Sequence, residues 1–162
     1  MYGLPIDDVD IKILTMLQED CSTPTARIAD EVNLSNTPCY RRIKRLEKDG
    51  FITKYKAVLD AGLLGFTSVC FIKLKVRKNA PDKDVHVFKQ QVVNHPNVSG
   101  VFRVACDFDF LLLTRFRDTA QFNDLIKIIY ACNFCVEADY LVVTDEYKND
   151  QTLELHKVAV FS

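Results

Sequence analysis

The sequence predicts an α+β protein, with a helical N-terminal domain and a C-terminal domain in which strands and helices alternate. Apolar residues recur at helical spacing in three stretches before residue 50, and they alternate with a period of 2 in several stretches after residue 67. Between these regions, Asp60, Gly62 and Gly65 mark a hinge. We therefore expect one domain over residues 1–60 and a second over residues 61–162.

The composition narrows the class of protein further. Hydrophobic residues make up 48% of the 162 residues, which is enough for a packed core and argues against disorder. The sequence has no apolar run of about 18 residues, so we expect no membrane span. Its first residues are acidic and lack the basic and apolar regions of a signal peptide. We therefore expect a cytoplasmic protein.

Two helices are expected before residue 34. The apolar face of the first, over residues 7–19, has spacings of 3, 4 and 4 and consists of Ile6, Val9, Ile13 and Leu17. Thr23 is expected to cap a second, shorter helix that has Pro24 at its first position. The inward residues of that helix would be Ile28, Ala29 and Val32. Asn33 and Leu34 then form a tight connection to a third helix.

The third helix has both a start signal and an end signal. Ser35 is a good N-cap because its hydroxyl can accept a hydrogen bond from the free amides of the first turn. Pro38 is tolerated near a helix start, and Gly50 can adopt the left-handed conformation that ends a helix. The inward stripe, at spacings of 4 and 3, is expected to be Cys39, Ile43 and Leu46.

Positive charge is concentrated on this third helix and just after it. Residues 35–56 contain seven Lys and Arg and two Asp and Glu, a net charge of +5, whereas the whole chain carries −1. A basic region on an otherwise acidic protein favours a polyanionic partner. A solvated Lys/Arg face would explain the charge alone equally well.

Three helices, of which the last two are short and closely connected, predict a winged helix-turn-helix domain. A three-helix bundle without a ligand would explain the apolar stripes. It would not explain why the arginines are concentrated on the third helix, or why small polar residues stand at the N-terminus of that helix. Both kinds of residue are suited to contacts with phosphates and bases. We therefore expect double-stranded DNA as a partner, bound through Ser35, Asn36, Thr37, Pro38, Tyr40, Arg41, Arg42, Lys44 and Arg45.

The remaining pattern predicts a sheet with two helices. Residues 51–60 are expected to form a strand, either a wing or a connector. Further strands are expected over residues 70–76, 98–104, 108–116 and 136–144, with helices over residues 82–93 and 119–130 and a hairpin turn around residues 105–107. This β-α-β-β-α-β order is that of the ferredoxin-like fold, an antiparallel sheet with both helices on one face. The tail, residues 153–161, could add an edge strand.

One face of that sheet would lack a cover from its own chain. We expect Phe71, Phe102 and Phe110 to lie on it and to form an exposed apolar patch. Self-association is the usual way in which such a patch is buried.

The cysteines and histidines do not predict a metal site or a cofactor. The chain has six Cys, and a zinc site would need a second ligand pair in addition to Cys132 and Cys135. The three His are isolated from one another. We expect reduced, mostly buried thiols, with no catalytic residues and no metal, although a redox role for the Cys132/Cys135 pair and for Cys106 stays open.

Four segments carry motifs that occur together in a known family. They are residues 7–20, residues 28–35, residues 37–52 with the run TPCYRRIKRLE, and residues 107–112 with the run DFDFLL. On these motifs the chain resembles the Lrp/AsnC (feast/famine) family of bacterial and archaeal transcription regulators, over nearly its whole length. The resemblance implies an N-terminal DNA-binding domain and a C-terminal domain for effector binding and oligomerisation. It also implies dimers that assemble into tetramers or octamers, and a small-molecule effector, most often an amino acid.

The resemblance places the effector near the hairpin, at Ala105, Cys106, Asp107 and Asp109. The two carboxylates could hold an ammonium group, although aspartates also simply favour turns. Family members usually have Gly where this chain has Cys106, and a Cβ there could narrow the pocket or strain a position with positive φ. The segment around Thr37 and Tyr40 resembles the branch of the family associated with cysteine, so L-cysteine is one candidate effector.

Two other function classes were weighed against a DNA-binding regulator. One is a metabolite-binding or thiol redox-sensing oligomer without specific DNA binding. The other is a small enzyme, for which the sequence has no nucleophile–base pair, phosphate loop or HExxH motif. We therefore expect no enzymatic activity.

Overall fold

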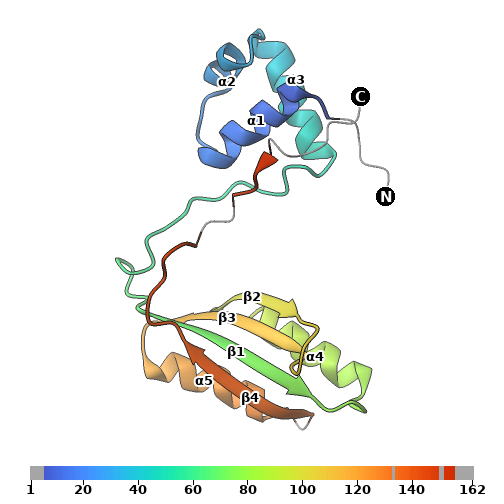
Figure 1. The fold of residues 1–162 in the computed structure, drawn as a ribbon, viewed down its shortest axis with the longest axis vertical. Helices are drawn as coiled ribbons and strands as arrows, with labels where there is room; N and C mark the ends of the chain where they lie inside the picture. The colour runs from blue at the N-terminus through green and yellow to red at the C-terminus, as the bar shows by residue number, and fades with distance from the viewer. Residues whose placement is uncertain (1–5, 133, 150–151, 156–162) are drawn as a thin grey trace. The chain divides into compact units, whose positions relative to one another are not determined.

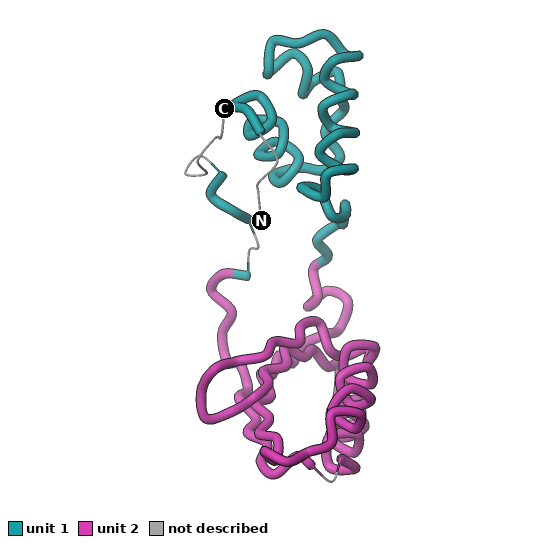
Figure 2. The backbone as a smooth tube through the Cα atoms, turned by 90° about the vertical axis from the view of Figure 1, so that its right-hand side faces the viewer, with its two compact units in different colours: residues 1–59, 149–162 teal, residues 60–148 magenta. Residues whose placement is uncertain are grey.

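The computed structural model describes residues 6–132, 134–149 and 152–155, and the chain divides into two compact units. One unit contains residues 1–59 and 149–162, and the other contains residues 60–148 (Figure 2). Within the described residues, no helix is both long enough and apolar enough to cross a membrane.

The first unit is built from three helices. They are α1 (Asp8–Glu19), α2 (Thr25–Glu31) and α3 (Asn36–Lys48) (Figure 1). Their buried residues form one apolar core made of Ile13, Ile28, Ala29, Val32, Cys39, Ile43 and Leu46. The predicted stripe of α3 is confirmed, since Cys39, Ile43 and Leu46 all belong to this core. One edge of α3 is therefore fixed, and its other side chains are free to serve a second purpose.

The helix starts agree with the sequence prediction in part. Asp7 caps α1 by accepting a hydrogen bond from the amide of Asp10 at 2.9 Å. The predicted cap of α2 by Thr23 is wrong, because the helix begins at Thr25 and the extended Pro24 is its N-cap. Ser35 does occupy the N-cap of α3, but its hydroxyl makes no capping hydrogen bond. The N–H groups of the first turn of α3 therefore make no hydrogen bond to a capping side chain.

The segment after α3 is a connector without a strand. Gly50 ends the helix in the left-handed region with a φ of +82°, as predicted. The strand predicted for residues 51–60 is wrong, since this segment has no regular secondary structure. A strand needs a neighbouring strand to satisfy its backbone groups, and no described strand of this chain pairs with the segment. The connector instead exposes apolar side chains, of which Val58 is 88% exposed.

The second unit has the predicted ferredoxin-like order. Its elements are β1 (Ser68–Val76), α4 (Asp82–Val93), β2 (Val98–Arg103), β3 (Phe110–Phe116), α5 (Thr119–Tyr130) and β4 (Cys135–Val142). The four antiparallel strands lie in the order β2-β3-β1-β4. Both helices cover the same face of the sheet (Figures 1 and 2). The core lies between the sheet and these helices and includes Ile72, Leu74, Phe88, Leu112, Leu125 and Ile129.

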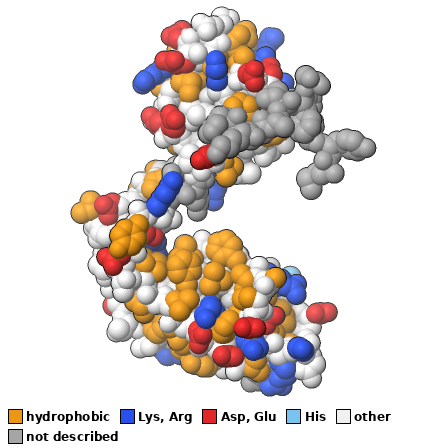
Figure 3. Space-filling model, in the orientation of Figure 1, with side chains coloured by type: hydrophobic (Ala, Val, Ile, Leu, Met, Phe, Trp, Pro, Cys, Tyr) orange, Lys and Arg blue, Asp and Glu red, His pale blue; other side chains and the backbone are white. Residues whose placement is uncertain are grey.

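The opposite face of the sheet has no cover from the described part of its own unit. We call it the open face and define its apolar residues as Phe71, Phe102, Leu111, Leu113 and Leu141. Figure 3 shows hydrophobic side chains on it among basic and acidic ones. The prediction that Phe110 lies there is wrong, because Phe110 pairs with the inward residue Leu74 and is only 6% exposed. Leu111 takes its place, since successive strand residues point to opposite faces.

The described part of the tail contacts α1. The side-chain amide of Gln18 donates to the carbonyl of Leu153 and accepts from its N–H, both at 2.9 Å. Residues 152–155 form no strand, and residues 156–161 of the predicted edge strand lie outside the described residues. Gln18 therefore supplies to Leu153 the two hydrogen bonds that a neighbouring strand would have made.

Candidate functional site

The exposed side of α3 carries a row of polar and basic side chains. Thr37, Arg41, Lys44 and Lys48 follow one another at spacings of 4, 3 and 4, which places them along one line of the helix, away from its buried stripe. We call these four residues the outward line. All of them are exposed, and Arg41 and Lys48 make no ion pair with any described residue. Arg41 and Lys48 thus present unneutralised positive charge to the solvent.

Lys44 is the one member of the outward line that has an acidic partner. Its ammonium group lies 2.6 Å from Glu47, one helical turn on, and 5.6 Å from the centre of the Tyr40 ring. Tyr55 of the connector donates to Glu47 at 3.0 Å. Burial, together with this hydrogen bond to a carboxylate, raises the pKa of Tyr55 to about 12. Exposed pairs of this kind are weak, so Lys44 can exchange Glu47 for another anion at little cost.

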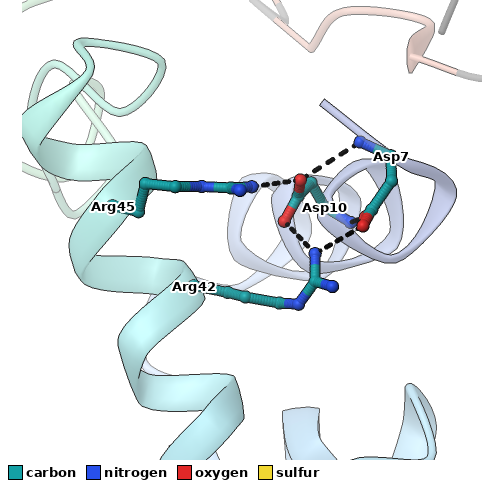
Figure 4. A network of polar contacts seen from close by, with 4 residues as sticks. All are labelled: Asp7, Asp10, Arg42 and Arg45. Atoms are coloured by element: carbon teal, nitrogen blue, oxygen red, sulfur yellow. Dashed lines mark hydrogen bonds and ion pairs between the residues drawn. The ribbon is translucent and has the colours of Figure 1, made fainter. Parts of the chain in front are cut away.

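Two arginines of α3 turn the other way, toward α1 (Figure 4). Arg42 lies with its Nη1 atom 2.7 Å from Asp7 Oδ2 and 2.9 Å from Asp10 Oδ1. Arg45 pairs through Nη2 with the other oxygen of Asp10. Arg42 was predicted to contact DNA, but the structure places it in an ion-pair network inside its own unit.

Asp10 is the centre of this network. Its side chain has no solvent exposure, and its Oδ2 atom also accepts from the amide of Asp7 at 3.1 Å. A buried carboxylate is costly unless it is paired, and the two guanidinium groups supply that pairing. Burial alone would raise the pKa of Asp7, but the Asp10 amide and Arg42 outweigh it and hold the pKa of Asp7 below its usual value. Hydrogen bonds to Asp7 and Asp10 raise the pKa of Arg42.

The start of α3 opens onto a shallow hollow. Its volume is about 270 Å³, and it is lined by Thr25, Asn36, Thr37 and Tyr40. Ser35 and Pro38 are exposed beside it. The uncapped amides of the first turn, the hydroxyls and the positive end of the helix dipole together favour an anion at this position. The structure therefore brings the predicted residues at the start of α3 together with Thr25, which the sequence interpretation had not selected.

The predicted effector residues lie on the turn between β2 and β3. Ala105, Cys106 and Asp107 are exposed, and the carboxylate of Asp107 has no hydrogen-bond partner among the described residues. Asp109 differs, because its carboxylate accepts from the amide of Val76 at 2.7 Å while its own N–H donates to Leu74 at 2.8 Å. Asp109 thus joins the turn to the end of β1, whereas the Asp107 carboxylate makes no such bond within the described residues.

The cysteines give no support to a thiol site. The expected strain at Cys106 is absent, because Asn33 is the one non-glycine residue with positive φ in the described chain. Burial raises the pKa of Cys132 and of Cys135, which disfavours the thiolate form of each. Among the described residues, no group of His, Cys, Asp and Glu could hold a metal ion.

Comparison with known families assigns both halves of the chain. Residues 6–53 match the family described as winged helix-turn-helix DNA-binding, and residues 69–153 match the Lrp/AsnC ligand binding domain. The chain belongs to the Lrp/AsnC family. It is therefore a DNA-binding transcription regulator with a ligand-binding domain rather than an enzyme.

Individual Lrp/AsnC proteins agree with this assignment. The chain is 32% identical to the DNA-binding transcriptional activator DecR of Escherichia coli K12 over 122 residues, which cover 75% of this chain and 80% of that protein. It is 33% identical to a leucine-responsive regulatory protein of Rhizobium meliloti over 121 residues, covering 75% and 77%. The L-Met complex of a transcriptional regulator from Neisseria meningitidis is similar with a TM-score of 0.86 at 29% identity, covering 93% of this chain and 97% of that one.

Two residues of this site were not among the residues predicted from the sequence. Lys48 belongs to the outward line and was missed, although its spacing from Thr37 and Arg41 could have found it. Asp10 was missed for a different reason. Its place near the start of α1 is visible in the sequence, whereas its burial against two arginines depends on how α1 and α3 pack.

Proposed function

We propose that this regulator binds specific sequences of double-stranded DNA through the outward line of α3. We also propose that an amino acid bound in the second unit changes its affinity for that DNA. The observation that carries the proposal is the unpaired state of Arg41 and Lys48 on the exposed side of a helix whose other edge is buried. An α-helix fits the major groove, where arginine can bond guanine and lysine can pair with phosphates.

Each residue at the start of α3 has a part in this proposal. Ser35, Asn36, Thr37 and Pro38 would lie against a phosphate or a base edge, with the free amides of the first turn as further donors. Tyr40 is 53% exposed and would contact the sugar–phosphate backbone or the thymine methyl groups. Arg41 and Lys44 would make the central contacts, and Lys48 would extend them along the groove.

The effector would bind at the turn between β2 and β3. Asp107 would hold the ammonium group of an amino acid, while the exposed backbone of Ala105 and Cys106 would bond its carboxylate. Asp109 would shape the turn through its hydrogen bond to Val76. The relatives named for leucine and bound to L-Met support the amino-acid class. L-cysteine is our first candidate within that class, on the resemblance of the segment around Thr37 and Tyr40.

Self-association would supply the pairs of α3 helices that dimeric operators require. The open face and the apolar connector are the surfaces that a second copy would bury. The connector would gain a strand partner, which no described strand of its own chain provides. We propose a dimer as the basic assembly, with tetramers or octamers built from it. We also propose that residues 1–60 and 61–162 fold as separate domains in the cytoplasm, which limited proteolysis would test at the connector.

Selection of genomic fragments by the purified protein tests the function. The expected result is a fragment class bound at least about 100-fold more tightly than bulk DNA at physiological salt. Substitution of Arg41 by Ala should weaken that binding, whereas Lys83→Ala, an exposed lysine on α4, should leave it unchanged. Calorimetry with the twenty amino acids then tests the effector. If no fragment exceeds bulk DNA, DNA reading is not the function.

A further inference from the structure

Asp10 forms hydrogen bonds that fix the positions of three other groups. Its Oδ1 atom accepts from Arg42, and its Oδ2 atom accepts from Arg45 and from the amide of Asp7. The side chain is only 1% exposed, so its oxygens depend on these donors rather than on water. Since a buried carboxylate must keep its donors, the two arginines are held where Asp10 requires them.

The two arginines differ in their exposure and in how many of their N–H groups lack a partner in the described part of the chain. Arg42 is the less exposed at 30%, and a single nitrogen of its guanidinium bonds both Asp7 and Asp10. The side chain of Arg45 is 45% exposed and bonds Asp10 through Nη2 alone, so its other N–H groups have no partner among the described residues. Arg45 also follows Arg41 by one helical turn, which places it next to the outward line.

We propose that Asp10 is a positioning residue that holds Arg45 ready for a phosphate of the bound DNA, while Arg42 secures Asp10 and does not contact DNA. The inference rests on the proposed DNA-binding function and names a part of its interface. A guanidinium is a planar fork, so it can bond Asp10 on one side and a phosphate on the other. Because Arg45 is already ordered, it loses less conformational freedom when DNA binds.

Charge and positioning predict opposite results for Asp10→Asn. The substitution removes one negative charge close to a polyanion, so electrostatics alone predicts tighter DNA binding. The neutral amide has one acceptor oxygen instead of two and lacks the charge that strengthens both guanidinium bonds, so Arg45 is held less firmly. Positioning therefore predicts weaker binding to the selected fragment, by roughly threefold to tenfold, the cost of ordering one long side chain.

The test is a double-mutant cycle on the full chain. Binding of the selected duplex is measured by fluorescence anisotropy over a salt series for the wild type, D10N, R45A and D10N/R45A, each below its melting temperature. We expect R45A to weaken binding and to reduce the salt slope by about 1, as loss of one phosphate contact does. We expect D10N to cause no further weakening once Arg45 is gone.

A second pair of variants separates positioning from folding. R42A disturbs the same network but leaves the Asp10–Arg45 pair, so we expect a lower melting temperature with an unchanged salt slope. R45K keeps Asp10 and the positive charge but lacks the fork, so we expect weaker binding with the wild-type slope. R45K stays informative if D10N does not fold.

Each contrary outcome has a definite meaning. Binding by D10N that equals or exceeds the wild type, effects of D10N and R45A that simply add, or an R45K that binds as tightly as the wild type would each overturn the positioning of Arg45. An R45A variant with unchanged affinity would overturn it while leaving the proposed function in place. A wild-type protein that prefers no duplex would overturn the function, and this inference with it.

Discussion

The Nη1 atom of Arg42 on α3 lies 2.9 Å from the Oδ1 atom of Asp10, a carboxylate of α1 that has no contact with solvent. This pair links the first and third helices of the DNA-binding unit beside their apolar core. It also separates the basic residues of α3 into two groups. Arg42 and Arg45 pair with Asp10, and Arg45 is the more exposed of the two, whereas Arg41 and Lys48 stay unpaired on the outward line.

Replacing Arg42 by Ala should destabilise the first unit. The substitution leaves Asp10 buried with one arginine instead of two, and we expect a loss of about 2 kcal/mol, below the full penalty for a broken buried pair because Arg42 is partly exposed. This corresponds to a melting temperature lower by roughly 10 °C for a unit of this size. Arg41→Ala is the matched control. Thermal unfolding followed by circular dichroism should show that it changes the free energy of unfolding by no more than about 0.5 kcal/mol. Equal melting temperatures for the two variants would contradict the network.

The stability of the first unit should depend on pH through Asp7. Its pKa in the folded protein is lowered below the ordinary value of 3.8, because the Asp10 amide and Arg42 outweigh the effect of burial. A lowered folded pKa means that its contribution is present above pH 3.8 and is lost as the pH falls through that value toward the folded pKa. Urea unfolding between pH 3 and 6 should therefore show a smaller loss of stability in Asp7→Asn. An identical pH profile in both proteins would count against the pairing.

The open face should govern self-association. Phe102 is 51% exposed and pairs with Leu111 of the neighbouring strand, so Phe102→Glu places a charge within the apolar patch. We expect the assembly to dissociate at micromolar concentration, as sedimentation velocity would show. Val87→Glu is the matched control, because Val87 is an equally exposed apolar residue on α4. Dissociation by the control, or its absence in Phe102→Glu, would place the interface elsewhere.

The two aspartates of the β2–β3 turn should have separable effects. Asp107→Asn should weaken amino-acid binding by at least about tenfold, because it removes the charge that pairs with the ammonium group. Asp109→Asn should instead lower the melting temperature of the second unit, because its carboxylate accepts from the amide of Val76. Calorimetry and thermal denaturation measure the two effects. If Asp109→Asn greatly weakened amino-acid binding but left the melting temperature unchanged, Asp109 and not Asp107 would be the ligand-binding carboxylate.

Local periodicity predicted most of the fold. The helix over Thr119–Tyr130 was predicted within the bounds that the structure has, because its apolar spacing and flanking residues agree. The strand expected over residues 70–76 is likewise confirmed, since it lies within β1 (Ser68–Val76). Patterns of this kind depend on a few neighbouring residues, so one sequence is enough to show them.

The errors came from features that depend on distant residues. Phe110 and Leu111 are both apolar, so alternation cannot tell which of them points inward until the register with Leu74 is known. The connector has a strand-like sequence, but no strand in the described part of the chain pairs with it. Arg42 and Arg45 are as basic as Arg41, and only the packing of α1 against α3 shows that they face Asp10. In each case the deciding contact lies far away in the sequence.

The contrast between Arg42, which is held inside its own unit by Asp7 and Asp10, and Arg41, which is exposed and unpaired among the described residues, is tested most directly by the salt dependence of DNA binding. The measurement is the slope of the logarithm of the binding constant against the logarithm of salt concentration, for the wild type, Arg41→Ala and Arg42→Ala on one selected duplex. We predict that Arg41→Ala reduces the slope by about 1 and that Arg42→Ala leaves it unchanged. A slope reduced by Arg42→Ala and unaffected by Arg41→Ala would contradict the account.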